Sequence, residues 1–396
     1  MTEQVCYPQV KNIGLRGIPV ADTRISVVDG VQGELQYRGF SIEDLAGQAT
    51  FEEVVYLLFY GKLPSGSQLD FFSNQLRAAR ALAPEILEIL AGRPVTAGPM
   101  DVLQGTVPLL ADWDPDLGDA SRESFQRQAL RLTAQLATVL AAWHRIRKGL
   151  KPVSPRDDLG HAANFLYMLS GKEPSEHMAR TLDICLVLHA DHTFNASTFT
   201  ARQVASSRAH MYASVAAAIG ALSGELHGGA NTRVMEMIME IGSVDKVAEY
   251  IKARLDAGER IMGMGHAVYK TIDPRAPILL EMSRELCSQT GDQRLLEITE
   301  EVCRVTQAEF RTRKDMDIFP NVDFYSGITY SLMGIEPDLF TPMFAISRVA
   351  GWCAHVIEER FAEAQEKPAL YRPKAEYIGE YCGDRGCTFT PLEERG

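Results

Sequence analysis

The chain has 396 residues, of which 46% are apolar and 23% are charged, as in ordinary soluble globular proteins. This composition excludes collagen, a mainly disordered chain and a small disulfide scaffold. The net charge is 40 minus 52, or −12, which argues against a general affinity for nucleic acid or anionic membranes. A local cluster of arginines can still bind an anionic small molecule. The length predicts two or three domains, or one large two-lobed unit.

Cysteine usage and the start of the chain indicate a cytoplasmic protein. Five of the seven cysteines are scattered, so we expect reduced thiols. Cys382 and Cys387 form a close pair, but without a second pair or a nearby histidine they make a weak zinc site. Residues 1–12 lack the basic start and apolar stretch of a targeting signal. The longest apolar-looking segment, 215–222, is far shorter than the ~18 residues that suggest a membrane span.

The first predicted element is a small β-hairpin over residues 23–39. Short apolar alternations in this segment flank Asp29, Gly30 and Gly33, which are typical turn residues. After it, apolar residues recur at helical spacing. Residues 132–146 repeat at intervals of four and three, which predicts one buried stripe on a long helix. Similar patterns predict helices over 176–189, 207–221, 243–256, 277–289 and 293–313.

Two features predict where later helices begin. Asn231 is expected to cap a helix that starts near Thr232, and Asn321 is expected to cap a helix whose first turn contains Asp323. Thr341 and Pro342 predict a further start, with proline at the first helical position. We therefore expect a nearly all-α fold with one minor hairpin. The breaks between helices hold the unusual polar residues, so we look for chemistry there.

The first such break is the sequence LHADHTFN at residues 188–195. His189, Asp191 and His192 lie within four residues, and histidine and aspartate are common metal ligands. A metal-dependent hydrolase that carries stoichiometric zinc or iron is therefore one hypothesis. The ordinary alternative is a helix end whose polar groups cap the chain.

Two glycine-rich breaks each contain a histidine. In GELHGGAN, the glycines around His227 let backbone approach a ligand closely. In GMGHAVYK, which contains His266, we expect several exposed backbone N–H groups that suit a phosphate or a purine edge. A plain turn between helices is the alternative explanation for each segment.

The remaining candidates are one carboxylate and three arginines. Asp323 lies in the first turn of the helix that Asn321 caps, where an acidic residue also simply complements the helix dipole. Arg275, Arg348 and Arg372 would each be ordinary surface charges in isolation. Taken with the histidines, they suit proton abstraction next to a carbonyl, with arginines that clamp a multiply charged acid and no metal.

These motifs, in this order, resemble the citrate synthase family. The resemblance runs from VDG…GELQYRGFSIEDLA near the N-terminus, through LHADH, GELHGGAN, GMGHAVYK, DPR, PNVDFYSG, SRVAGW and YRP, to RPKAEYIG at 372–379. The chain is similar to the shorter bacterial form, which lacks an extra N-terminal β-rich segment, so we expect no regulation by NADH. The resemblance implies a helical homodimer without a resident cofactor. Its large lobe would hold residues 1–228 plus 339–396, and its small lobe residues 229–338.

The resemblance also implies a role for each candidate in condensing acetyl-CoA with oxaloacetate. Asp323 would remove a methyl proton from acetyl-CoA while His227 hydrogen-bonds the thioester oxygen. His266 would polarise the ketone of oxaloacetate and protonate the developing alkoxide. Oxaloacetate would be held by His192, Arg275, Arg348 and Arg372, the last from the neighbouring subunit. CoA would contact Arg260, Ile261, Met262, Gly263, Met264, Gly265 and Lys314.

Three alternatives stay open at this point. In the same class, 2-methylcitrate synthase uses propionyl-CoA, and one methyl in an apolar pocket is worth only ~1–3 kcal/mol. Phe324, Tyr325 and the pair Met262 and Met264 are candidates for lining that pocket. The metal-dependent hydrolase is a different class. A non-catalytic scaffold is the third alternative, and the complete set of His227, His266 and Asp323 argues against it.

Overall fold

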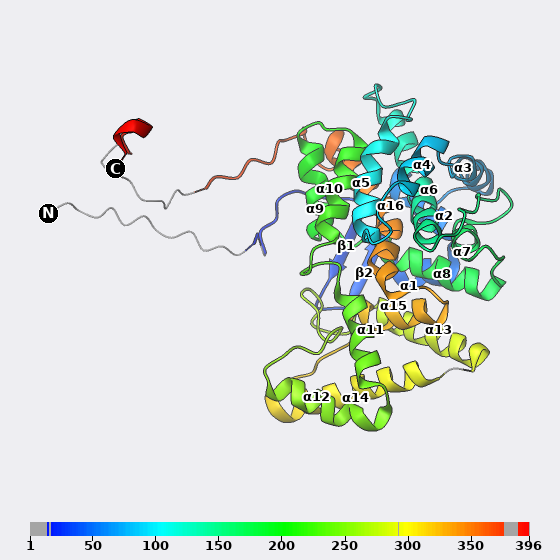
Figure 1. Cartoon of the computed structure of the whole chain (residues 1–396), viewed down its shortest axis with the longest axis vertical. Coiled ribbons are helices and arrows are strands. Elements are labelled where there is room, and N and C mark those ends of the chain that lie inside the picture. Colours follow the sequence, from blue (N-terminus) through cyan, green and yellow to red (C-terminus); the bar gives the residue numbers. More distant parts are fainter. Residues whose placement is uncertain (1–13, 16, 292, 376–386, 396) are drawn as a thin grey trace.

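The computed structural model describes residues 14–15, 17–291, 293–375 and 387–395 (Figure 1). Within these residues the chain forms sixteen α-helices and one three-stranded sheet, which confirms the predicted all-α fold. None of the described helices combines the length and the apolar content needed to cross a lipid bilayer.

The sheet contains the predicted hairpin and one additional short strand. Strand β1 (Ser26–Asp29) pairs antiparallel with β2 (Glu34–Tyr37), and β2 pairs with β3 (Phe40–Ser41). The hairpin is therefore confirmed. The sequence did not predict β3, because two residues are too few to show an alternation of apolar and polar side chains.

Most helices form one main body around a central helix. Its members are α1 (Ile42–Gln48), α2 (Phe51–Tyr60), α3 (Gly66–Ala78), α4 (Pro84–Ala91), α5 (Pro99–Ala111), α6 (Arg122–Arg147), α7 (His161–Ser170), α8 (Glu176–His189), α9 (Ala196–Ser206), α10 (Met211–Leu222) and α16 (Phe340–Arg360). Helix α16 is buried along almost its whole length and packs against α2, α6, α8 and α9 (Figure 1). The functional residues on α16 are therefore fixed by core packing.

The other helices follow one another in the chain between α10 and α16. They are α11 (Ala230–Ile241), α12 (Val247–Asp256), α13 (Arg275–Thr290), α14 (Arg294–Lys314) and α15 (Val322–Leu332). Helix α12 packs on α14, and α15 packs on α11 and α13. Figure 1 shows α12 and α14 at the end of the molecule opposite α9 and α10.

The helices that were predicted individually differ from the prediction mainly at their starts. Helix α16 begins at Phe340 after a 3-10 turn (Pro337–Leu339), so Pro342 is its third residue and not its first. Proline is tolerated there because the first N–H groups of a helix have no intrahelical partner. Helix α11 begins at Ala230, so Asn231 lies inside the helix instead of capping it. Asn321 does cap α15, since its Oδ1 accepts the N–H of Asp323 (3.0 Å).

The cysteine expectation is met in the helices. Cys185, Cys287 and Cys353 are buried free thiols, and Cys303 is a half-buried one. Cys382 lies outside the described residues, whereas Cys387 is disulfide-bonded.

Candidate active site

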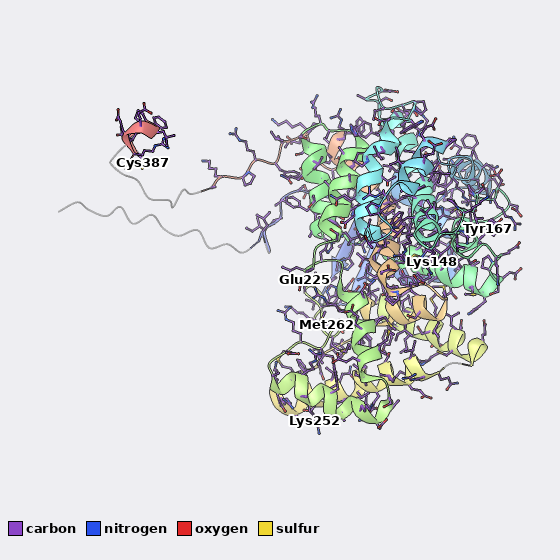
Figure 2. All side chains as sticks on the ribbon, viewed as in Figure 1. Lys148, Tyr167, Glu225, Lys252, Met262 and Cys387 are labelled. Atoms are coloured by element: carbon purple, nitrogen blue, oxygen red, sulfur yellow. The ribbon has the colours of Figure 1, made fainter. Side chains whose placement is uncertain are left out.

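A cavity of about 810 Å³ lies between the main body and the α11–α15 segment. It is lined by the loop that follows α8, the ends of α10 and α14, the starts of α11, α13 and α15, one turn of α16, and the loop that follows α12. Six of the predicted catalytic and oxaloacetate residues meet here: His192, His227, His266, Arg275, Asp323 and Arg348. Met262 also lines the cavity, and Figure 2 shows it on the same side of the molecule as Glu225, which lies two residues before His227.

His227 is held as a neutral hydrogen-bond donor. Its Nε2 accepts the backbone N–H of Ser197 (3.2 Å). Because a backbone N–H only donates, Nε2 carries no proton, and the ring proton must lie on Nδ1. Burial, and then the charge of Arg348, lowers the pKa of His227 to about 4. At neutral pH this residue is therefore an uncharged imidazole that donates through Nδ1.

His266 is also neutral, but its proton lies on the other ring nitrogen. Its Nδ1 accepts two backbone N–H groups, from Val268 (2.9 Å) and Tyr269 (3.1 Å), so the ring proton lies on Nε2. Burial lowers the pKa of His266 to about 4, and Arg275 adds to the effect, while Asp273 opposes it. The ring centroids of His266 and His192 are 5.7 Å apart. The cavity thus contains two neutral imidazoles with opposite tautomers.

Asp323 is the carboxylate that faces the same cavity. It is the second residue of α15, in the helical turn that Asn321 caps. Burial raises the pKa of Asp323 to about 6, with a further contribution from the charge of Asp273, while Arg275 and Arg348 oppose the rise. A carboxylate with this pKa is a stronger base than an ordinary aspartate and still ionises below pH 7.

Arg275 and Arg348 are both buried at the cavity wall. Arg275 donates from Nε and Nη2 to the two carboxylate oxygens of Asp273 (2.9 and 2.7 Å). Burial acts to lower the pKa of Arg275, but Asp273 outweighs it and the pKa is raised. Arg348 donates from Nε to the carbonyl oxygen of His189 (2.6 Å). These contacts fix two permanent positive charges that can bind an anionic substrate.

The predicted metal cluster does not assemble. His189 Nδ1 lies 2.6 Å from the carbonyl of Cys185, Asp191 accepts the Thr193 N–H (2.9 Å), and His192 Nε2 lies 3.2 Å from the Tyr269 hydroxyl. Across the described ranges, no group of three or more His, Cys, Asp and Glu side chains is placed to hold a metal ion. The metal-site interpretation of these three residues is therefore wrong, because each side chain is committed to a separate partner.

Arg372 is the one predicted oxaloacetate residue that does not line this cavity. It is exposed in the segment that follows α16. The residue before it is anchored on the main body: the Tyr371 hydroxyl donates to Glu359 (2.9 Å), and its N–H donates to Ser206 Oγ (3.3 Å). Figure 1 shows the chain leaving the main body beyond this anchor, next to α9 and α10. A role in a neighbouring subunit's site stays a prediction.

The predicted CoA residues 260–265 and Lys314 all line the cavity, with Lys314 at the end of α14. Gly263 has a φ of +75°, and a Cβ there would lie 2.8 Å from the Phe324 ring, so only glycine fits. The loop has fewer free backbone N–H groups than expected, since Gly265 donates its N–H to the carbonyl oxygen of Phe319 (2.8 Å).

Phe324 and Tyr325 are buried outside the cavity wall, which corrects their proposed place in an acyl pocket.

Several residues of the site were not predicted. Asp273 fixes Arg275, and its position two residues before that arginine is a signal that could have been used. Ser197 sets the tautomer of His227 across 30 residues of chain, and no local pattern indicates this. Arg313 and Phe310, one and four residues before Lys314, complete the cation-rich end of the cavity.

The sequence of the chain is similar to the sequences of known proteins. Residues 14–374 match the family model described as "Citrate synthase, C-terminal domain". The citrate synthase of Synechocystis sp. is 44% identical over 96% of this chain and 93% of its own length. The 2-methylcitrate synthase of Mycobacterium tuberculosis is 40% identical over 94% of this chain and 91% of its own length.

A solved structure gives the same result for the fold. The ternary complex of carboxymethyl coenzyme A and oxaloacetate with citrate synthase from Thermoplasma acidophilum has a TM-score of 0.88 and 28% identity. The match covers 96% of this chain and 98% of that one. Sequence, fold and the residues that meet in the cavity therefore lead to one conclusion: the chain belongs to the citrate synthase family.

Proposed function

We propose that the chain condenses acetyl-CoA with oxaloacetate and water to give citrate and CoA. The observation that carries the proposal is the convergence of one base and two oppositely protonated, neutral imidazoles in a single cavity. Asp323 has its pKa raised to about 6, while His227 and His266 are fixed as donors by backbone amides. Enolisation next to a thioester needs a base and a donor that act together, and a second donor is needed at the ketone.

The reaction follows from these protonation states. Asp323 takes a proton from the methyl group of acetyl-CoA, and His227 Nδ1–H stabilises the oxygen of the resulting enol. The enol carbon then attacks the ketone carbon of oxaloacetate. His266 Nε2–H binds the ketone oxygen and gives it a proton as the alkoxide forms. Water finally hydrolyses the citryl thioester and releases CoA, and no step requires a metal or a cofactor.

The positive and polar groups account for substrate binding. Arg275 and Arg348 would clamp the carboxylates of oxaloacetate, and His192 would help to hold it. Arg372 would reach the site of the partner in a homodimer, because it lies beyond an anchored tyrosine and outside its own cavity. The residues 260–265 and Lys314 would bind CoA. We further propose that the enzyme acts in the cytoplasm.

We also propose the division into two lobes, residues 1–228 plus 339–396 and residues 229–338. His192, His227 and Arg348 would then come from the large lobe, and His266, Arg275 and Asp323 from the small one. Closing the lobes on each other would exclude water from the enol. With this division, the site would be complete only when the two lobes close.

The pH dependence of the reaction provides one test. Asp323 must be ionised to act as a base, and its pKa is raised to about 6. His227 and His266, with pKa values lowered to about 4, stay neutral throughout this range. We therefore expect kcat/KM for acetyl-CoA to fall as the pH drops through about 6, with a slope of one on a logarithmic plot. An acid limb centred near 4 would contradict this assignment of the base.

The choice of acyl group is tested by CoA release. We expect the enzyme to release CoA from acetyl-CoA only when oxaloacetate is present, and to use propionyl-CoA with a lower kcat/KM. One methyl group is worth ~1–3 kcal/mol in an apolar pocket, so the preference is about 10-fold to 200-fold. A higher kcat/KM for propionyl-CoA would favour the 2-methylcitrate reaction, for which a relative is known. CoA release without oxaloacetate would contradict both.

A further inference from the structure

The tip of the β1–β2 hairpin is in tight backbone contact with the loop that carries His266. The carbonyl oxygen of Gly30 accepts the N–H of Lys270 (2.7 Å). Gly30 also lies so close to Val268 that an added Cβ would be 2.2 Å from the Val268 carbonyl oxygen. Real Cβ atoms do not approach this closely, so any side chain at Gly30 must displace the loop or the hairpin. The absence of a side chain at Gly30 therefore permits this contact.

The contact reaches His266 through a single peptide unit. No cis peptide bond occurs in the described part of the chain, so the C=O and N–H of the Val268–Tyr269 peptide point in opposite directions. Its C=O faces Gly30, and its N–H donates to Nδ1 of His266 (3.1 Å). A displacement of this peptide at the hairpin side therefore changes one of the two hydrogen bonds that Nδ1 of His266 accepts.

The base of the same hairpin is tied to the second loop of the site. Ser26 in β1 donates a short hydrogen bond to Asp191, and the N–H of Thr193 lies 3.0 Å from the Ser26 hydroxyl oxygen. Asp191 and Thr193 are the residues directly before and after His192 in the chain. His192 itself lies 3.2 Å from the hydroxyl of Tyr269, in the loop at the hairpin tip. The hairpin thus touches both loops that carry histidines of the ketone site.

The hairpin turn is rigid enough to transmit such a contact. Asp29 Oδ1 accepts the N–H groups of both Val31 and Gln32 (2.8 Å each). The N–H of Gly33 donates to the carbonyl of Asp29 (2.9 Å). These bonds fix the turn locally, so the position of Gly30 does not depend on the loop that it contacts.

We propose that the β1–β2 hairpin positions the ketone-binding histidines, and that Gly30 is the positioning residue through which it orients His266. Gly30 does not touch the substrate. It acts by holding the Val268–Tyr269 peptide, whose N–H, together with that of Val268, keeps the ring proton of His266 on Nε2, directed to the ketone oxygen. The identity of that substrate as oxaloacetate rests on the proposed function.

The test compares Gly30→Ala with Gly47→Ala. Gly47 lies in α1, and no atom lies within 4 Å of a Cβ added there, so it controls for the substitution itself. We expect Gly30→Ala to raise the KM for oxaloacetate roughly ten-fold or more, since a small displacement of a binding group has effects of this size. The KM for acetyl-CoA should change less than about two-fold. Gly47→Ala should match the wild type.

A second readout follows the His266 ring directly, by NMR titration of its ring nitrogens. In the wild type, Nδ1 should stay unprotonated until the pH approaches about 4. In Gly30→Ala the Tyr269 N–H should leave Nδ1 and only the Val268 N–H should remain on it, so at neutral pH the two ring-nitrogen shifts should move toward those of a mixture of tautomers. The groups that face this ring are Asp273 (4.0 Å from Nε2), Arg275, Tyr269 and His192, and both variants leave them unchanged.

A second pair of variants tests the same idea without adding a side chain at the contact. Asp29→Ala removes the acceptor that fixes the turn, and it should raise the KM for oxaloacetate in the same selective way. Asp29→Asn keeps an acceptor oxygen and should restore wild-type behaviour. If Gly30→Ala does not fold, the comparison of Asp29→Ala with Asp29→Asn tests the proposal in its place.

Two results would overturn the proposal. The first is a Gly30→Ala enzyme whose oxaloacetate KM and His266 titration equal those of Gly47→Ala. The second is an equal loss of function in Asp29→Ala and Asp29→Asn. The titration does not depend on activity. A wild type that releases no CoA with oxaloacetate would therefore refute the proposed function, while the titration would still test the hairpin.

Discussion

Replacing Asp323 with asparagine should lower kcat at least ~10²-fold, the loss expected when a general base is removed. Asparagine keeps the shape of the side chain at the start of α15, and the cap from Asn321 is a contact to backbone that the substitution leaves in place. It cannot accept the methyl proton of acetyl-CoA. The loss should therefore appear in kcat measured with both substrates saturating, with the fold intact.

A matched surface substitution makes this result interpretable. Asp245 is exposed in a 3-10 turn before α12 and does not line the cavity, so Asp245→Asn should keep wild-type kcat. An Asp323→Asn enzyme with near-normal kcat would remove Asp323 from the mechanism. Equal losses in both variants would point to a general effect of charge instead of a lost base.

The second large effect concerns Arg372, which we propose to act in the partner's site. Arg372→Ala should be nearly inactive as a pure dimer, although the residue is exposed and outside its own cavity. In a mixed dimer of one Asp323→Asn chain and one Arg372→Ala chain, one site receives both lesions. The other site combines an intact Asp323 with an intact Arg372 from its partner. Such dimers should therefore regain roughly half of the wild-type activity, since one of two sites is complete.

The complementation needs proof that mixed dimers form. Chains with two different affinity tags, co-refolded and purified on both tags in turn, provide it. Confirmed mixed dimers that stay as inactive as the two parents would show that Arg372 acts in its own subunit or has no role. Recovery of activity in separately folded chains that are mixed only in the assay would reveal subunit exchange.

Much of the fold was predictable because its signals are local. The alternation around Asp29 and Gly33 indicated the hairpin, and the repeat over 132–146 indicated the long helix α6. Helix starts were less certain because they depend on tertiary packing. Pro342 lies in the third position of α16 because the 3-10 turn before it already sets the helix direction.

The candidate site was predictable as a set of residues but not as a set of protonation states. The motifs around His227, His266 and Asp323 identify these side chains without their partners. Which ring nitrogen carries the proton is decided by backbone N–H groups, from Ser197 in one case and from Val268 and Tyr269 in the other. Every residue except proline has the same backbone N–H group, so composition and spacing do not indicate which of these groups donates to a histidine ring.

The metal hypothesis failed for a related reason. His189, Asp191 and His192 are close in the chain, but the end of α8 turns their side chains toward different partners. His189 stacks on Phe344 with ring centroids 4.0 Å apart, and Asp191 binds Ser26 and Thr193. Sequence proximity predicts a shared ligand only when the local backbone directs the side chains to one point, and here it does not.

The central claim is that Asp323 breaks a methyl C–H bond so that this carbon can bond to the ketone carbon of oxaloacetate. Acetyl-CoA with a fully deuterated methyl group, incubated with the enzyme and oxaloacetate in ordinary water, tests it directly by mass spectrometry of the product. We predict citrate that retains two of the three deuterons, formed more slowly than from unlabelled acetyl-CoA, and formed at least ~10²-fold more slowly still by Asp323→Asn. Free acetate that keeps all three deuterons, with no labelled citrate, would contradict the account.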